Sequence, residues 1–419
     1  MAKICIVVFT HKAKERVGLK KKGAKSTGFD GMKYYGLKYV VSEIDKSHSI
    51  EYCAPEYIDN YDFALVSITS YYDYMNIIKS MPRKRNRCKV IVGGAGFLSV
   101  NSIIDYIDIG VFGRAEGIIN DVIDGSNVDG VWRKIIDPLC AGLYIVRPPQ
   151  KLIKIEGLIE TSVGCKRKCS FCQYGWRSKF YEESGNNDYS SGFNDNEDML
   201  YSLDWSKTSG YLVSAIDGFT EQARSTVGKS MSTDDILKKM AERNDIDRDI
   251  KQLKLYNIWG FPFENMREYK SDVVELFRLI ASVLKKRTNI ILNNTHFVPM
   301  PMTPMESEPI NFGTLKNTDF MPINNGNLKV FSLTRETSPA TAAEQAIINR
   351  ISYEDRWKIK SIIMTSKYKS MGGSLKSMML KKHFAKYVVE FESPIPHIKR
   401  IDGLDKAKTA YHNRKKINY

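Results

Sequence analysis

The feature that most restricts the fold is an alternation of short apolar strands with helix-like segments along the first 150 residues. Strands separated by helices form a parallel sheet, so this part of the chain is predicted to be a doubly wound α/β domain. Ligands of such sheets bind at the carboxyl ends of the strands, where glycine turns let the backbone approach closely. The predicted strands are 3–9, 50–54, 63–68, 89–92 and 109–112, and the predicted helices lie near 32–44, 74–81 and 101–106.

The same alternation resumes after Pro148 and Pro149, which mark a linker. It predicts part of a β/α barrel, whose functional residues gather at the carboxyl ends of the strands. A stretch rich in Ser, Gly, Asn and Asp at 181–198 is predicted to be a long loop. The barrel strands are predicted at 157–161, 210–215, 253–259 and 290–293, and its helices at 233–243 and 269–285.

We therefore expect a Rossmann-like domain at 1–150, a partial barrel at 151–310 and a small basic α/β region at 311–419. In the last region, helices are predicted near 354–367 and 376–387. No apolar stretch approaches the roughly 18 residues that a membrane span needs, and the first residues lack the order of a signal peptide. Hence we expect no membrane partner and a cytoplasmic location.

Lysine and arginine outnumber aspartate and glutamate by 63 to 48, which gives a formal net charge of +15. Such a surplus indicates a polyanionic partner, and nucleic acid (DNA or RNA) is the predicted one. The alternative is a lysine-rich surface that is merely solvated. The segments suited to phosphate contacts are a loop at 12–25 with seven Lys or Arg residues and the C-terminal residues Arg400, Arg414, Lys415 and Lys416.

The seven cysteines do not form a disulfide framework, because their number is odd and four of them are scattered. The other three, Cys165, Cys169 and Cys172, follow a predicted strand in C-x3-C-x2-C spacing. Three thiolates can hold a four-iron cluster and leave one iron open to another ligand. The scattered cysteines are predicted to be small core residues: Cys5, Cys53, Cys88 and Cys140.

Two alternatives remain for the three neighbouring cysteines, namely a zinc site and a group of structural thiols. A zinc site would need a fourth ligand, and Cys140 and His296 are the nearest residues of a suitable type. Neither has a matching spacing, and His296 is otherwise expected to be a hydrogen-bonded core histidine.

The cysteine spacing, with the aromatic Phe171 just before the last cysteine, resembles the signature of the radical S-adenosylmethionine (SAM) superfamily. The resemblance implies a [4Fe–4S] cluster on Cys165, Cys169 and Cys172, with SAM bound to the fourth iron and Phe171 beside the cofactor. It also implies a one-electron reductant, such as flavodoxin or ferredoxin, as a partner. Cleavage of SAM then gives a 5′-deoxyadenosyl radical that abstracts hydrogen from a carbon, while the protein orients the cofactor and excludes water.

Strand 211–218 occupies the position where members of the superfamily bind the methionine end of SAM. The resemblance implies Ser214 and Asp217 as the ligands there, although the usual GGE-type sequence is absent. A nearby Val-Gly-Lys-Ser sequence at 227–230 suggests a phosphate loop, but Ala223 replaces its first glycine and this interpretation is set aside.

The run 254–264 resembles the later strand whose backbone lies along adenine, which implies Ile258 and Gly260 as contacts. Core packing is the alternative explanation for Ile258. The stretch 295–304 resembles the segment that closes the barrel in members with a cobalamin domain, so the matches together run from about residue 155 to 306. No residue is assigned a catalytic role.

The sequence Val-Ile-Val-Gly-Gly-Ala-Gly-Phe at 90–97, followed by Gly-Arg-Ala-Glu-Gly at 113–117, resembles the cobalamin-binding domain that precedes many radical SAM barrels. In that domain the paired glycines admit a nucleotide tail. The cobalt-ligating histidine motif is absent, because the surroundings of His11 do not match it. Two interpretations stay open, namely cobalamin binding and a sheet that docks the substrate.

The basic composition and the incomplete cobalamin motif resemble phage-associated members that rearrange a hypermodified thymine in DNA. The implied function is isomerisation or another modification of a nucleobase, in the cytoplasm of a bacterial or phage-infected cell. The alternatives are a cobalamin-dependent radical SAM methyltransferase or a methylthiotransferase-like enzyme, and, in another class, a non-catalytic zinc or nucleic-acid-binding protein. Tyr174, Trp176 and Arg177 follow the cysteines and would shield a cluster, stack on a base or pack the loop.

Overall fold

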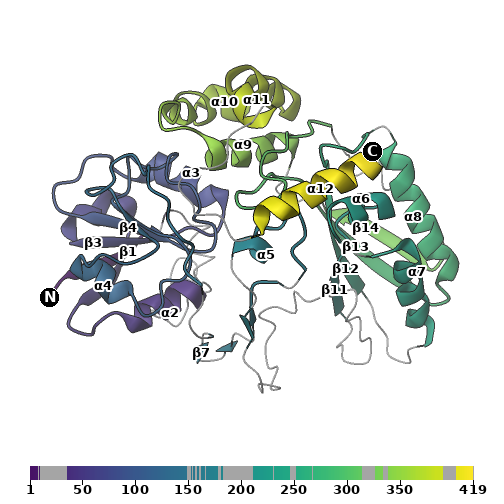
Figure 1. Cartoon of the computed structure of the whole chain (residues 1–419), viewed down its shortest axis with the longest axis horizontal. Coiled ribbons are helices and arrows are strands. Elements are labelled where there is room, and N and C mark those ends of the chain that lie inside the picture. Colours follow the sequence, from purple (N-terminus) through teal and green to yellow (C-terminus); the bar gives the residue numbers. More distant parts are fainter. Residues whose placement is uncertain are drawn as a thin grey trace.

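A computed structural model describes most of the chain, which carries a mainly parallel sheet near the N-terminus and a second parallel sheet on the opposite side (Figure 1). The α/β class is therefore confirmed, whereas the doubly wound and partial-barrel descriptions and the division into three parts stay predictions. The described residues are 1–7, 9, 35–148, 152, 154–155, 158–159, 162–165, 167–177, 181–182, 211–229, 231–245, 252–266, 268–313, 326–333, 338–389 and 403–418.

The first sheet has the strand order β2-β1-β3-β4-β5-β6, in which β6 runs antiparallel to β5 and the other neighbours are parallel. Cys5 and Val90 enter a core cluster on one face, and Ile4 and Ile91 enter another on the opposite face. Because both faces are buried, the strands read as continuous apolar runs. The bounds are β1 Lys3–Val7, β2 Ser49–Cys53, β3 Phe63–Ser67, β4 Lys89–Gly93, β5 Ile109–Val111 and β6 Val131–Arg133, with α2 Tyr35–Glu43, η2 Pro55–Asn60, α3 Tyr71–Ser80 and α4 Ile119–Asp124.

The helix predicted near 101–106 is wrong, because this segment consists of consecutive turns. The amide of Ile103 donates to the carbonyl of Val100, and the amide of Tyr106 donates to that of Ile103. These turns still bury Ile103, Ile104 and Tyr106, so the apolar pattern reflects burial without a helix. The four scattered cysteines are buried, as predicted for small core residues.

The second sheet has the order β11-β12-β13-β14 with every neighbouring pair parallel. Residues of β12 and β13 pack in one core cluster with α7 and α8, and α8 contributes Tyr269, Val273, Leu276, Phe277 and Ile280 at helical spacing. The bounds are β11 Tyr211–Ala215, β12 Gln252–Trp259, β13 Thr288–His296 and β14 Leu328–Leu333, with α6 Glu221–Thr226, α7 Thr233–Glu242, η4 Arg243–Asp245 and α8 Tyr269–Val283.

The segment before the cysteines differs from the barrel strand predicted at 157–161. Its described part, β8 (Leu158–Ile159), pairs antiparallel with β7 (Lys154–Ile155). The next strand, β9 (Ser162–Val163), pairs antiparallel with β10 (Tyr181–Glu182). The cysteine loop therefore starts from a small antiparallel pair that belongs to neither of the two parallel sheets.

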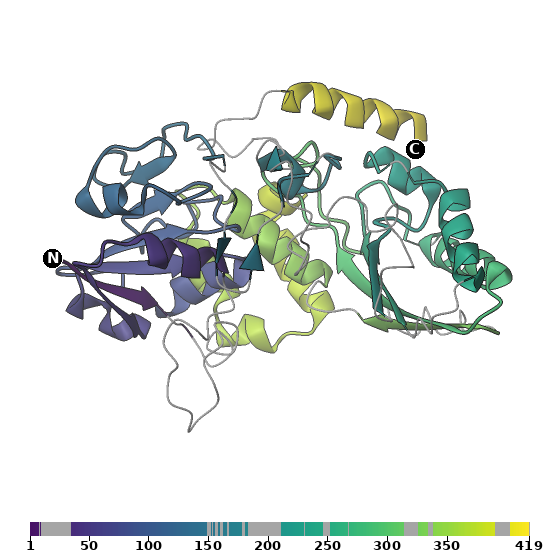
Figure 2. The same ribbon diagram turned by 90° about the horizontal axis from the view of Figure 1, so that it is seen from below.

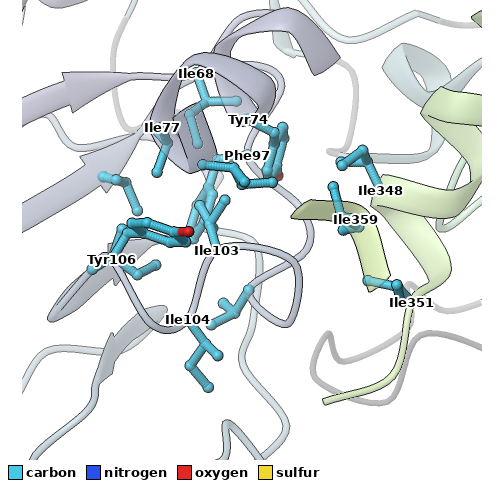
Figure 3. Close-up of a cluster of buried hydrophobic side chains, with 14 of the residues drawn as sticks. Ile68, Tyr74, Ile77, Phe97, Ile103, Ile104, Tyr106, Ile348, Ile351 and Ile359 are labelled. Atoms are coloured by element: carbon cyan, nitrogen blue, oxygen red, sulfur yellow. The ribbon is translucent and has the colours of Figure 1, made fainter. Parts of the chain in front are cut away.

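Helices α9 and α11, which follow β14, return to the first sheet. Figure 3 shows Ile348, Ile351 and Ile359 facing the cluster that contains Tyr74 and Phe97. The prediction of a helix near 376–387 is confirmed by α11. The one at 354–367 is confirmed in part, because residues 357–363 are helical with a π-helical turn and a short helix begins at Ser366, with turns before and between them. The bounds are α9 Pro339–Arg350, η6 Ile359–Ile363, α10 Ser366–Ser370, α11 Gly373–Val388 and α12 Leu404–Asn418.

Helix α12 lies at the periphery of the molecule in Figure 2 and passes over α5 (Gln173–Arg177) and α6 in Figure 1. The sequence predicted a basic, polar segment here and no helix. Among the described helices, none has both the length and the apolar character that crossing a bilayer requires.

Candidate functional site

The cysteine loop forms a tight hydrogen-bonded turn between β9 and α5. The amide of Cys172 donates to the carbonyl of Cys169 at 3.0 Å, and the indole Nε1 of Trp176 donates to the same carbonyl at 2.9 Å. The ammonium of Lys168 lies 5.3 Å from the centre of the Trp176 ring. Trp176 is buried, so the packing interpretation of this residue is supported. Cys165, Cys169 and Cys172 lie on this turn as half-buried side chains.

Three neighbouring segments hold Ser170, the residue that follows the second cysteine. Its amide donates to the carbonyl of Val227 at 2.7 Å, and its carbonyl accepts from the amide of Met305 at 3.2 Å. Its hydroxyl accepts a hydrogen bond of 3.1 Å from Arg414 on α12. The cysteine turn is therefore fixed by the end of α6, the loop after β13 and the C-terminal helix.

The end of β11 lies close to the cysteines. Lys229 donates to Asp217 Oδ2 at 2.6 Å and to the carbonyl of Ala215, which caps the end of the strand. Burial raises the pKa of the Cys169 thiol to about 12, and the charge of Lys229 acts in the opposite direction while Asp217 adds to the rise. Because the amide of Ser170 donates to the carbonyl of Val227, two residues before Lys229, the Asp217–Lys229 pair lies beside the turn. Ser214 lies on β11 opposite Leu255 in the β-ladder.

An apolar cluster joins the cysteine turn to the ends of β12 and β13. Phe171 and Ile258 pack against it, and the Phe171 and Phe261 ring centres are 6.0 Å apart. The structure thus brings together two of the residues that the sequence implied for the cofactor. The buried members of the cluster are Val227, Phe261, Phe297, Met305 and Tyr411.

Gly260 lies at the turn after β12 and is required there. Its φ is +73°, and an added Cβ would stand 2.5 Å from Nε2 of His296. His296 is buried with its ring nitrogens 2.8 Å and 2.7 Å from the carbonyl oxygens of Phe297 and Asn311. It is the core histidine that the sequence suggested, and its ring nitrogens are already engaged instead of serving a metal.

Three residues near the site were not assigned a role from the sequence. Glu264 accepts from the amides of Gly260 and Phe261 at 2.8 Å and 3.0 Å, and burial raises its pKa to about 8. Arg224 and Lys229 fix the segment at the end of β11, because they donate hydrogen bonds to the carbonyls of Gly218 and Ala215. Glu264 follows the strand-end Gly260 by four residues, and this spacing could have indicated that its carboxylate binds the turn. No sequence pattern pointed to the roles of Arg224 and Lys229.

The three thiols suit an iron–sulfur cluster in kind, because thiolates are the soft ligands that such clusters require. Within the described part of the chain, no three His, Cys, Asp or Glu side chains are already gathered as a metal-binding set. The cysteines share one turn, and binding of a cluster would draw their sulfur atoms together.

The paired-glycine turn after β4 is filled by the protein itself. An added Cβ would stand 2.5 Å from the carbonyl oxygen of Ile68 at Gly94, and 2.7 Å from the carbonyl carbon of Thr69 at Gly96. Arg177 on α5 donates to the carbonyls of Gly94 and Ala95. The small size of these glycines is therefore used for contacts within the protein, which does not fit a cradle for the nucleotide tail of cobalamin. The same contacts connect the first sheet to the cysteine loop.

No protein-family profile matches the chain. No curated protein sequence matches it either. Among solved structures, it is similar to the cobalamin-dependent S-adenosylmethionine radical enzyme OxsB with aqua-cobalamin and S-adenosylmethionine bound, at a TM-score of 0.26 and 10% identity, covering 100% of this chain and 61% of that one. The form with aqua-cobalamin bound gives a TM-score of 0.27 and 10% identity, covering 100% and 62%. The chain thus spans about three fifths of the length of these structures.

Proposed function

We propose that the chain is a radical SAM enzyme that binds a [4Fe–4S] cluster through Cys165, Cys169 and Cys172. The observation that carries the proposal is a C-x3-C-x2-C turn fixed beside the carboxyl ends of parallel strands, next to an apolar cluster. When bound, the cluster and SAM supply a radical that takes a hydrogen atom from a substrate carbon. Such chemistry needs a site from which water is excluded.

The side chains around the turn support specific roles in this proposal. Phe171, Ile258 and Phe261 form an apolar wall that would keep water from the cofactor. Asp217 and Lys229 offer a carboxylate and an ammonium side by side, and each could bind one group of the methionine end of SAM. Ser214 stays a predicted ligand at this end of the cofactor, together with Asp217.

The test is anaerobic reconstitution with iron and sulfide, followed by addition of SAM and dithionite. Wild-type protein should turn brown, bind about four irons per chain, and release 5′-deoxyadenosine. Replacement of Cys165, Cys169 or Cys172 by Ala should remove most of the iron. Cys140→Ala is the matched control, because Cys140 is a buried cysteine in the core of the first sheet and should leave iron binding unchanged. A colourless zinc protein, or one inert toward SAM after reduction, would refute the proposal.

We further propose a nucleobase of DNA or RNA as the substrate class and a flavodoxin or ferredoxin as the electron donor. Residues 352–389 carry nine Lys or Arg and two Asp or Glu, a net charge of +7 that complements a phosphate backbone. Binding of DNA should weaken steeply between low and high salt, and salt-independent binding would contradict a phosphate-binding role. The exposed lysines in this segment include Lys360, Lys367, Lys369, Lys381 and Lys382.

A further inference from the structure

Helix α12 is polar over most of its surface, yet it is docked on the candidate site. Its buried side chains, within the described residues, are Leu404 and Tyr411. Tyr411 is fully buried and belongs to the apolar cluster that also contacts Phe171. Positions 404, 408, 411, 415 and 418 recur at helical spacing, so one face of the helix is turned toward the site.

Two lysines on this face reach buried carboxylates in the loop after β13. Lys408 lies 2.6 Å from Oε1 of Glu306, and Lys415 lies 2.9 Å from Oε2 of Glu308. Each glutamate side chain is 6% exposed. A buried carboxylate is costly without a partner, so these pairs keep the helix in place. They also correct the expectation that Lys415 is available for phosphate contacts.

Arg414 connects the helix directly to the cysteine turn. Its Nη2 donates to the hydroxyl of Ser170 at 3.1 Å, and its Nε donates to the carbonyl of Thr226 at 3.1 Å. Asn418 adds a hydrogen bond of 2.7 Å to the hydroxyl of Thr226. Ser170 is 2% exposed and Thr226 is fully buried, so Arg414 reaches into the interior at this point.

We infer that α12 is a clamp on the cysteine turn, with Arg414 as its positioning residue and Tyr411 closing the apolar cluster. Of the polar groups of Ser170, the amide and carbonyl are bound by loops of the second sheet, and the hydroxyl is bound by α12. Loss of Arg414 should therefore loosen the turn without unfolding the sheet behind it. The inference deepens the proposed function, because this turn would hold the cluster, but the clamp can be tested without one.

The first experiment measures the rate at which iodoacetamide alkylates the three cysteines of cluster-free protein, read by peptide mass spectrometry. Arg414→Gln should speed alkylation of Cys169 and Cys172 by about 10- to 100-fold, the range expected when a hydrogen bond from a charged donor is lost. Lys416→Gln is the control, because Lys416 is exposed on the same helix and the change of charge is identical. Unchanged circular dichroism shows that both variants fold.

Two further variants separate positioning from general destabilisation. Ser170→Ala removes the acceptor of the Arg414 hydrogen bond and should speed alkylation in the same direction. The double variant should then show less than the product of the two single effects, because both remove one contact. Arg414→Lys should restore part of the protection. Equal alkylation rates in Arg414→Gln and Lys416→Gln would overturn the inference.

The second experiment follows iron loss to a chelator after anaerobic reconstitution. Arg414→Gln should lose iron faster than wild type and Lys416→Gln. If wild type takes up no cluster while Arg414→Gln still exposes the cysteines, the proposed function fails and the clamp stands. If wild type holds a cluster and Arg414→Gln matches Lys416→Gln in both experiments, the clamp fails and the proposed function stands.

Discussion

Replacement of Gly260 by alanine should destabilise the second sheet through two separable effects. The first is conformational, because the φ of +73° lies in the left-handed region, which costs a non-glycine residue about 1–2 kcal/mol. The second is steric, because the new Cβ would stand 2.5 Å from Nε2 of His296. The imidazole packs 4.6 Å from the Trp259 ring and contacts carbonyl oxygens through its ring nitrogens, so it cannot move aside freely.

Overpacking of this kind costs about 1–3 kcal/mol. Gly260→Ala should therefore lower the free energy of unfolding by about 2–5 kcal/mol in total. Gly326→Ala isolates the conformational effect, because its φ is +53° and nothing lies within 4 Å of the added Cβ. Gly373→Ala controls for both effects, because its φ is not positive and its surroundings are open; it should raise stability by about 0.4–1 kcal/mol.

The assay is urea unfolding followed by far-ultraviolet circular dichroism, with all variants at one pH and salt concentration. The expected order of stability is Gly373→Ala, wild type, Gly326→Ala and then Gly260→Ala. In a His296→Ala background, the excess cost at Gly260 over Gly326 should disappear. Equal losses for Gly260→Ala and Gly326→Ala in the wild-type background would show that the contact with His296 imposes no strain.

Three other perturbations test the surroundings of the site. Arg224→Met should cost about 2–6 kcal/mol in urea unfolding, because the fully buried guanidinium donates to the carbonyls of Gly218 and Phe219 and each buried carbonyl left without a donor costs about 1–3 kcal/mol; a smaller loss would show that these carbonyls find other donors. Glu264 has a folded pKa of about 8 against an ordinary 4.5, so the folded state binds more protons between these values and stability should fall as pH rises through this window, by up to about 1.4 kcal/mol per unit. Glu264→Gln should flatten that slope, and an unchanged profile would assign it to other groups. Cobalamin added during reconstitution should not be retained after desalting, because contacts within the protein fill the turn at Gly94; stoichiometric retention would restore the cobalamin-dependent alternative.

The strands were the part of the fold most accessible from the sequence. Runs such as Lys89–Gly93 are buried on both faces, and a short continuous apolar run of this kind is typical of a strand inside a parallel sheet. Helix α9 escaped prediction because its alanine-rich sequence is buried around much of its circumference and gives little amphipathic pattern. Helix α12 escaped because its docking depends on ion pairs and hydrogen bonds, which leave no periodic apolar signal.

The parts of the site that could be predicted from the sequence are those formed by residues close together in the chain. Cys165, Cys169 and Cys172 lie within eight positions, so their spacing alone indicated a shared turn. Arg414 and Ser170 are 244 positions apart, and no pattern in a single sequence joins them. The glycine pair near 93–96 was read as a ligand cradle, because a sequence cannot distinguish room for a ligand from room for the neighbouring backbone.

The return of α9 and α11 to the first sheet has a consequence for synthesis on the ribosome. Helix α9 starts at Pro339, whereas β6, the last strand of the first sheet, ends at Arg133, so the cover lies 206 positions after the sheet. At about 5–20 residues per second, the nascent chain carries one uncovered apolar face for roughly 10–40 s. A truncated product that stops before α9 keeps that face permanently, which makes such fragments prone to aggregate and dependent on chaperones while they persist.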